Sequence, residues 1–270
     1  MSEGTNRPMR LWLTSAKGGV GVSFAAANLA LSLSRRGKRV LLIDGSPMCR
    51  CLDTVFSCAP DVVYDISDVA AHRIEAEKAL LCPMADGPLL LPGAFSGKDA
   101  VVGAALVALL DEISATLALD FVIVDAPATA DTLAAAPAFD RVLVLTDPSP
   151  AALRAAETAS VSLSEVGAPS GALLINRFSL RHPRESGQEK AILMVDESKL
   201  SLLGILPIVG ELSETAHRYV GKYPLLAGKA FRLEPATVAF DNLAARLLGE
   251  DVPLLSGIRA VRSYRRKLLY

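Results

Sequence analysis

Several features that would place this chain in a familiar class are absent from its sequence. Its 270 residues carry a formal net charge of −1, so no basic surplus draws it to nucleic acid through a global field. No uninterrupted apolar run is long enough to span a bilayer, and residues 1–8 are polar and do not follow the pattern of a secretory signal. Four cysteines in a chain of this length are not a disulfide framework, and they favour a reducing setting. These absences lead us to expect a cytoplasmic protein.

The most informative absence is that of a single lysine from a glycine-rich loop. Residues 15–23 read Ser-Ala-Lys-Gly-Gly-Val-Gly-Val-Ser, a glycine-rich loop that resembles the phosphate-loop pattern GxxxxGK[ST] but has Val22 where the pattern has lysine. In that pattern the lysine reaches the β- and γ-phosphates of a nucleotide. Lys17 keeps a positive charge near the start of the loop. We therefore expect a phosphate site whose chemistry is weakened.

The loop lies between a predicted strand and a predicted helix. Residues 11–14 are an apolar run, residues 23–36 carry apolar side chains at helical spacing, and Gly37 is a suitable helix stop. In such a unit the backbone N–H groups of the loop and the helix N-terminus face an anion. Glycines alone often do no more than permit a tight turn, but the whole unit favours phosphate binding.

Strands and helices alternate along the chain. Unbroken apolar strands that alternate with helices predict an α/β fold with a mostly parallel central sheet and helices on both faces. We expect one domain over residues 1–250. The predicted strands are residues 40–43, 89–91, 121–124, 142–145, 172–175 and 202–206, and the predicted helices include residues 101–117, 150–166 and 237–248.

Polar residues close three of these strands, at the end of a parallel sheet where ligands bind. Asp44 and Asp125 close two strands, and Asn176 closes a third. A strand-terminal carboxylate beside a phosphate loop holds the water shell of Mg²⁺, while the Ser23 hydroxyl is a direct ligand. The alternative is that each aspartate caps a turn or a helix, but two of them at successive strand ends favour the magnesium role.

Several segments spread over nearly the whole chain resemble the ParA/MinD family of deviant Walker ATPases, in the family's order. An Arg-x-Leu-Asp block and a Tyr-Asp-x-x-Asp-Val block are typical of its MinD branch. The resemblance implies a P-loop NTPase fold, ATP or ADP with Mg²⁺ as ligand, and spatial regulation of cell division through septum placement. The segments are residues 17–23, 40–44, 50–53, 62–69, 124–127, 175–177, 203–207 and 248–253.

The resemblance also implies roles for individual residues. Lys17 matches the family's signature lysine, which reaches a partner's phosphates across a nucleotide-sandwiched dimer. Asn176 and Arg177 match a pair near the adenine, and the segment after Pro207 matches the other side of the base. A homodimer, or a heterodimer with a paralogue, and a division-inhibitor-type protein are the implied partners. The implied nucleotide-binding residues are Lys17, Gly18, Gly19, Val20, Gly21, Val22, Ser23, Phe24, Asn176, Arg177 and Pro207.

Two departures from the family put catalysis in doubt. Val22 replaces the loop lysine, and Ser46 stands where the family has a second acidic residue that helps to position the attacking water. Phosphoryl transfer depends on positioning and charge neutralisation, so the implied catalytic set of Lys17, Asp44 and Asp125 is incomplete. Either Lys17 compensates and slow turnover survives, or hydrolysis is weak or lost, which is the interpretation we favour.

The C-terminal tail predicts a second function. Residues 251–270 are expected to form a linker and a basic amphipathic helix, because residues 258–270 hold five basic side chains and no acidic one. Such helices bind anionic membrane surfaces, and the family places its membrane-targeting helix here, which implies a peripheral position on the inner face of the cell membrane. The alternatives are a helix docked on its own domain and a nucleic-acid-binding tail. The predicted membrane-facing residues are Ile258, Val261, Tyr264, Leu268 and Leu269.

Two other functions fit parts of the sequence. An active ParA-like ATPase would segregate DNA or other cargo, although the apolar side of the tail and the MinD-type blocks speak against it. Cys49 and Cys51 have chelate spacing, so a metallochaperone is the other alternative, although a metal site usually needs four ligands and no histidine is close in sequence. Ordinary half-buried cysteines are the simpler interpretation.

Overall fold

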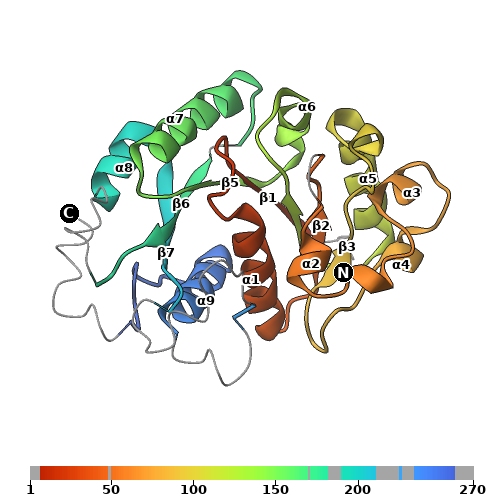
Figure 1. Cartoon of the computed structure of the whole chain (residues 1–270), viewed down its shortest axis with the longest axis horizontal. Coiled ribbons are helices and arrows are strands. Elements are labelled where there is room, and N and C mark those ends of the chain that lie inside the picture. The colour runs from red at the N-terminus through yellow and green to blue at the C-terminus, as the bar shows by residue number, and fades with distance from the viewer. Residues whose placement is uncertain are drawn as a thin grey trace, which may run out of the picture.

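Seven strands form one central sheet in the computed structural model, which describes residues 7–47, 50–169, 171–181, 190–210, 225–226 and 234–258. Their order is β3-β2-β4-β1-β5-β6-β7, and every pairing among them is parallel (Figure 1). The predicted α/β fold with a parallel sheet is therefore confirmed. The strands are β1 (Met9–Thr14), β2 (Val40–Asp44), β3 (Leu89–Leu91), β4 (Phe121–Asp125), β5 (Arg141–Thr146), β6 (Ala172–Phe178) and β7 (Ser201–Pro207).

The four long helices that the sequence predicts are all found, with ends that differ by one or two residues. The first of them begins at Val22 because Gly21 takes the left-handed conformation, with φ at 96°, and so ends the loop. Five helices of four to eight residues have no counterpart in the sequence-based prediction, since they are too short to show a period. The helices are α1 (Val22–Arg35), α2 (Leu52–Val55), α3 (Ile66–Ala70), α4 (Ala76–Ala79), α5 (Gly103–Thr116), α6 (Ala130–Leu133), α7 (Pro150–Glu165), α8 (Ala191–Ser198) and α9 (Pro235–Leu247), with 3₁₀ turns η1 (Ala59–Asp61), η2 (Gly97–Asp99) and η3 (Ala136–Ala138).

The sheet is covered on both faces. Leu11 and Leu13 of β1 pack in one apolar core, and Trp12 between them packs in the other, because successive side chains of a strand point to opposite faces. The core that holds Leu11 and Leu13 is covered by α1, α2 and α9, and the core that holds Trp12 by the helices from α3 to α8 (Figure 1). Burial on both faces explains why the strands read as unbroken apolar runs.

The last described segment, residues 251–258, packs on the domain. The side chain of Ile258 is 4% exposed and belongs to the core under α3 to α8. The segment is also tied to α9, since Asn242 Nδ2 donates a hydrogen bond to the carbonyl of Ser256 over 2.8 Å. The assignment of Ile258 to a membrane-facing surface is therefore corrected, because the structure places this side chain in the core.

The other predicted membrane-facing residues, Val261, Tyr264, Leu268 and Leu269, lie outside the described residues. Residues 182–189, most of a polar run that the sequence predicts to be an exposed loop, lie outside them too. Across the part of the chain that is described, we find no helix with the length and apolar composition needed to cross a bilayer.

Candidate functional site

The glycine-rich loop connects β1 to α1 at the carboxyl end of the sheet (Figure 1). Gly19 and Gly21 have φ angles of 78° and 96°, which residues with side chains rarely adopt. Gly21 at the start of α1 has no side chain to cap the helix, so N–H groups of its first turn are left for an anion. The loop borders a cavity of about 560 Å³, which is lined by Ser15, Ala16, Lys17, Gly18, Gly19, Gly21, Val22, Ser23, Phe24, Ser46, Cys51, Val55, Asp125, Pro127, Ala128 and Thr129.

Asn176 holds the loop in place from β6. Its Nδ2 donates a hydrogen bond to the carbonyl of Val20 over 2.7 Å, and a Cβ at Gly21 would lie only 2.5 Å from the same nitrogen. Asn176 is 4% exposed, and neither it nor Arg177 nor Pro207 is among the described residues that line the cavity. The structure thus shows Asn176 bonded to the loop, while the contact of these three residues with a base stays a prediction.

Asp44 and Asp125 lie side by side at the ends of β2 and β4, where the two strands are paired in register. The structure therefore brings together the two carboxylates that the strand pattern singles out. Asp44 accepts hydrogen bonds from three backbone N–H groups, the shortest of which is 2.8 Å, from Cys51. Oδ2 of Asp125, in contrast, is buried and has no hydrogen-bond partner among the described residues.

Burial perturbs the ionisation of both carboxyl groups. Burial, helped by the negative charge of Asp44, raises the pKa of Asp125 to about 7, against the lowering effect of a hydrogen bond with Ser23. Burial likewise raises the pKa of Asp44, although its backbone hydrogen bonds oppose the shift. Burial disfavours the charged form of each carboxyl group, and a cation beside them would relieve that cost. The unpartnered oxygen of Asp125 therefore fits a nearby Mg²⁺, while the roles of Ser23 as direct ligand and of the two carboxylates through water stay predictions.

Cys51 contacts the same hydroxyl group. Its Sγ donates a hydrogen bond to Ser23 Oγ over 3.0 Å, and the half-buried side chain lines the cavity. Cys49 lies outside the described residues. Within the ranges that the structure describes, no group of three or more His, Cys, Asp or Glu side chains is arranged to hold a metal ion. Cys51 is thus one of the residues that line the loop cavity.

Lys17 is engaged within its own chain. Its Nζ lies 3.1 Å from Oδ2 of Asp147, which directly follows β5, and the two side chains are 35% and 11% exposed. Although burial raises the pKa of Asp147, hydrogen bonds from Ser149 and Lys17 hold it below its ordinary value. Sequence reasoning missed Asp147, although it follows an apolar run in the same way as the other strand-end aspartates.

Both departures from the family pattern lie at the cavity. Val22 is the first residue of α1 and packs against the core that α1 covers. Ser46 follows β2, and its N–H donates to Oδ1 of Asp44 over 3.2 Å. Among the described residues that line the cavity, only Lys17 carries a positive charge. Sequence reasoning overlooked a third departure, since Ala16 stands at the first glycine of the GxxxxGK[ST] pattern.

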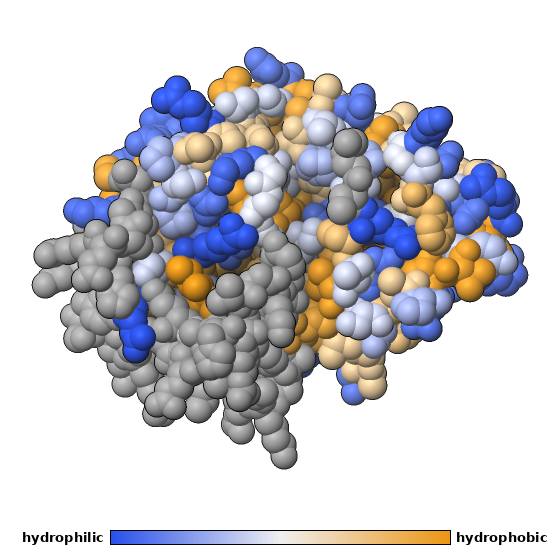
Figure 2. Space-filling view, in the orientation of Figure 1, coloured by the Kyte–Doolittle hydropathy of each residue, from blue (hydrophilic) through white to orange (hydrophobic). Residues whose placement is uncertain are grey.

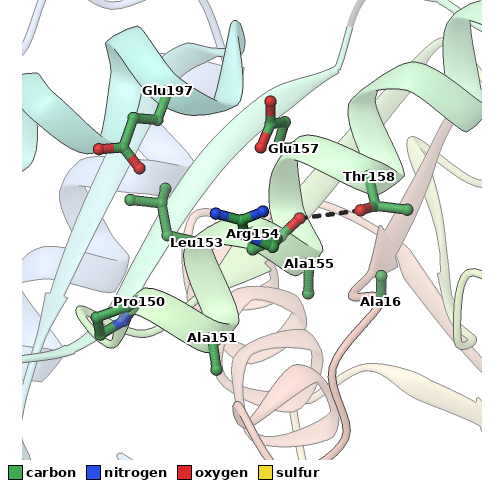
Figure 3. A pocket seen from close by; sticks show the side chains of 9 residues that line it. All are labelled: Ala16, Pro150, Ala151, Leu153, Arg154, Ala155, Glu157, Thr158 and Glu197. Carbon is green, nitrogen blue, oxygen red and sulfur yellow. Dashed lines mark hydrogen bonds between the residues drawn. The ribbon is translucent and has the colours of Figure 1, made fainter.

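A second hollow, of about 630 Å³, lies beside α7 and α8 and also includes Ala16 (Figure 3). Figure 3 shows Arg154 and Glu157 on α7 and Glu197 on α8 around it, with the Thr158 hydroxyl donating to the carbonyl of Arg154 over 3.0 Å. Two carboxylates and one guanidinium give this hollow no net attraction for an anion. Of these two cavities among the described residues, the loop cavity is therefore the one whose lining fits a phosphate group.

Contacts of its own side chains stabilise the Arg-x-Leu-Asp block, residues 50–53. Arg50 Nε lies 2.8 Å from Oδ2 of Asp53, and the guanidinium lies 4.0 Å from the centre of the Phe95 ring. Phe95 is 63% exposed and Val63 is 73% exposed, and Figure 2 shows apolar residues at the surface near α3 and α4. The block therefore connects the cavity, through the adjacent Cys51, with an exposed apolar surface.

A strand, a glycine-rich loop and a helix, with carboxylates at the ends of adjacent parallel strands, define a protein with the P-loop NTPase fold. A protein family described as "ParA: NUBPL iron-transfer P-loop NTPase" matches residues 9–223. Because this match covers more than half of the sequence, the chain belongs to the ParA/MinD family of P-loop NTPases. The resemblance stated from the sequence motifs is thereby confirmed.

Its relatives include proteins of one particular kind. The septum site-determining protein MinD of Synechocystis is 30% identical over 266 residues, which cover 95% of this chain and 97% of that protein. MinD of Bacillus subtilis is 31% identical over 252 residues, which cover 90% of each protein. A chain of the MinC:MinD cell division protein complex of Aquifex aeolicus superposes with a TM-score of 0.76 at 28% identity, covering 91% of this chain and 98% of that one. Within the family the chain is thus a MinD homologue with the P-loop NTPase fold.

Proposed function

We propose that this protein is a MinD-like regulator of cell division that binds an adenine nucleotide with Mg²⁺ and hydrolyses ATP weakly or not at all. The observation that carries the proposal is the charge of the loop cavity. Val22 stands where the pattern has lysine, and the remaining cation, Lys17, is paired with Asp147 at 3.1 Å. Nucleotide binding is supported by the glycine conformations and by the uncapped N–H groups at the start of α1.

Weak hydrolysis follows from two missing groups. A charge-assisted hydrogen bond contributes about 1.5–3 kcal/mol, which corresponds to roughly one to two decades of affinity or rate, and Val22 makes no such bond. Ser46 offers a hydroxyl, which is not a base at neutral pH, where the family has an acidic group. Bound Mg²⁺ would neutralise phosphate charge, and Ser23 with Asp125 would orient it at the loop. The two losses therefore affect turnover more than binding.

Family membership also supports a proposal for partners. The Aquifex structure contains MinD together with MinC, so we propose a division-inhibitor-type partner and dimerisation with a second copy or a paralogue. The proposed membrane contact rests on the tail beyond residue 258, whose five basic side chains accompany Val261, Tyr264, Leu268 and Leu269. Two short tails joined in a dimer would bind far more strongly than one. The protein would then divide its time between the cytoplasm and the inner face of the cell membrane.

Steady-state phosphate release by the purified full-length chain tests the catalytic part of this proposal. We expect release at least about tenfold slower than from a MinD relative with an intact loop, assayed in parallel. Val22→Lys is expected to improve nucleotide affinity more than turnover, because Ser46 still lacks a carboxylate. Asp125→Ala is the control, since release that survives it comes from a contaminant. Turnover equal to that of the relative, and abolished by Asp125→Ala, would contradict the proposal.

A second candidate function has one observation in its favour. The matching family's description includes iron transfer, and Cys49-Arg50-Cys51 has chelate spacing. Against it, the Cys51 thiol is bonded to Ser23 Oγ in the loop cavity. Iron, zinc or nickel that stays with the protein after desalting, and is lost in Cys51→Ser, would favour the metallochaperone. Protein that retains no metal would leave the nucleotide-dependent regulator.

A further inference from the structure

The loop cavity is poor in positive charge. Among the described residues that line it, Lys17 is the only cation and Asp125 the only anion. Asp44, the in-register neighbour of Asp125, places a second buried carboxyl group at the same strand ends. Val22 and Val55 contribute apolar walls. A phosphorylated ligand would therefore meet the backbone N–H groups of the loop and a single lysine.

Asp147 neutralises that lysine. The carboxylate is 11% exposed, and its two oxygens are both engaged. Oδ2 pairs with Lys17 Nζ at 3.1 Å, and Oδ1 accepts hydrogen bonds from the N–H of Ser149, over 3.1 Å, and from its hydroxyl. Because β1 and β5 are paired in parallel, the loop and Asp147 emerge at adjacent strand ends. The charge of Lys17 is thus already offset within the chain, and a ligand has to compete with Asp147 for it.

We propose that the cavity selects nucleoside diphosphates over nucleoside triphosphates, and that Asp147 sets this selectivity by holding Lys17. The inference rests on the proposed nucleotide binding and specifies the form of nucleotide that the site prefers. Backbone N–H groups at a helix N-terminus bind one phosphoryl group whatever the side chains are. A third phosphate depends on side-chain cations in this type of loop. Here Val22 supplies none and Lys17 is already paired, so the added negative charge meets no unpaired side-chain cation among the described residues that line the cavity.

The test compares the dissociation constants of ADP and of a non-hydrolysable ATP analogue, measured by calorimetry on the full-length chain with and without Mg²⁺. We expect the wild-type chain to bind ADP about tenfold or more tightly than the analogue. Asp147→Asn keeps the size of the side chain but removes its charge. Since the ion pair is partly exposed, we expect the variant to bind the analogue about three- to tenfold more tightly, with a smaller change for ADP.

Two further variants isolate the part played by Lys17. In the double variant Lys17→Gln/Asp147→Asn, the gain in analogue affinity is expected to vanish, because it acts through the lysine. Asp120→Asn is the matched control. Asp120 lies just before β4, at the opposite end of the sheet from the loop, and its carboxylate pairs with Lys38 at 3.3 Å. Removing this carboxylate is expected to change neither dissociation constant.

The possible outcomes separate this inference from the proposed function. Equal or tighter binding of the analogue by the wild-type chain overturns the diphosphate preference but leaves nucleotide binding intact, whereas binding of neither nucleotide overturns both. A folded Asp147→Asn protein that keeps the wild-type ratio removes Asp147 as the determinant. Should Asp147→Asn not fold, Lys17→Gln decides. An unchanged ratio supports the inference, and a tenfold or greater loss of analogue binding, about 1.4 kcal/mol, overturns it because Lys17 would already be serving the third phosphate.

Discussion

The carboxyl group of Asp125 makes the stability of the metal-free protein depend on pH. Its pKa is raised from 3.8 to about 7, first by burial and then by the charge of Asp44. An acid whose pKa is higher in the folded chain than in the unfolded chain binds a proton on folding. Its stabilising contribution is fully present below about pH 4 and is lost as the pH rises through about 7. Asp125→Asn removes this ionisation and nearly preserves the shape of the side chain.

The size of the effect follows from the shift of the pKa. A rise from 3.8 to about 7 amounts to about 4 kcal/mol between fully acidic and alkaline conditions, of which about 2–3 kcal/mol falls between pH 5 and pH 8. Asp125 is 4% exposed, so solvent screens the charge little. Each kcal/mol shifts the unfolding midpoint of a chain of this size by about 2–4 °C. The midpoint of Asp125→Asn relative to wild type is therefore expected to be about 5–10 °C higher at pH 8 than at pH 5.

Scanning calorimetry of the two proteins at both pH values, without Mg²⁺, measures this difference. Asp120→Asn again serves as the control for loss of a carboxylate, and it is expected to behave alike at both pH values because its partner, Lys38, lies on the surface. Added Mg²⁺ is expected to stabilise the wild-type protein at the higher pH and to have little effect on Asp125→Asn. A midpoint difference between the two proteins that is the same at both pH values would refute the reasoning.

Three other changes test two separate parts of the structure. Asn176→Ala removes the hydrogen bond to the carbonyl of Val20, so we expect the free energy of unfolding to fall by about 1–3 kcal/mol. We also expect weaker binding of ADP, measured by calorimetry. Unchanged ADP affinity would show that the loop keeps its shape without this hydrogen bond. A chain that ends after Ile258 is expected to lose binding to anionic vesicles in a flotation assay and to keep its unfolding midpoint. Ile258→Glu, in contrast, is expected to lower the unfolding midpoint because it buries a charge in the core. Vesicle binding that survives the truncation would contradict a membrane role for the tail.

The carboxylates were predictable from the sequence, but the ion pair beside them was not. Asp44 and Asp125 converge because both end strands of a parallel sheet, and that conclusion needs only the strand pattern. The pairing of Lys17 with Asp147 needs the strand order as well, since it arises because β1 lies between β4 and β5. One sequence does not fix which strands are neighbours. Asp147 could have been named as a strand-end candidate, but its partner could not.

Two other side chains show which contacts the sequence pattern alone does not determine. Ile258 fits the apolar side of a predicted helix, but a side that faces lipid and a side that faces the protein's own core have the same pattern. Asn176, predicted to close its strand, lies two residues before the end of β6, and its amide bonds to the loop carbonyl of Val20. A buried amide needs a partner, and the sequence does not show that a nearby backbone group already provides one.

The shape of the loop does not depend on the side chains that hydrolysis needs. Gly21 supplies the left-handed turn, and Asn176 fixes the adjacent carbonyl, so the N–H groups at the start of α1 keep their direction whatever stands at position 22. Val22 packs against the core that α1 covers, where a lysine would have to lead its charge out into the cavity. Its replacement thus removes a phosphate contact and adds apolar packing. A chain of this family with valine at this position can therefore keep the fold and the uncapped N–H groups of the loop, which the proposed diphosphate preference requires.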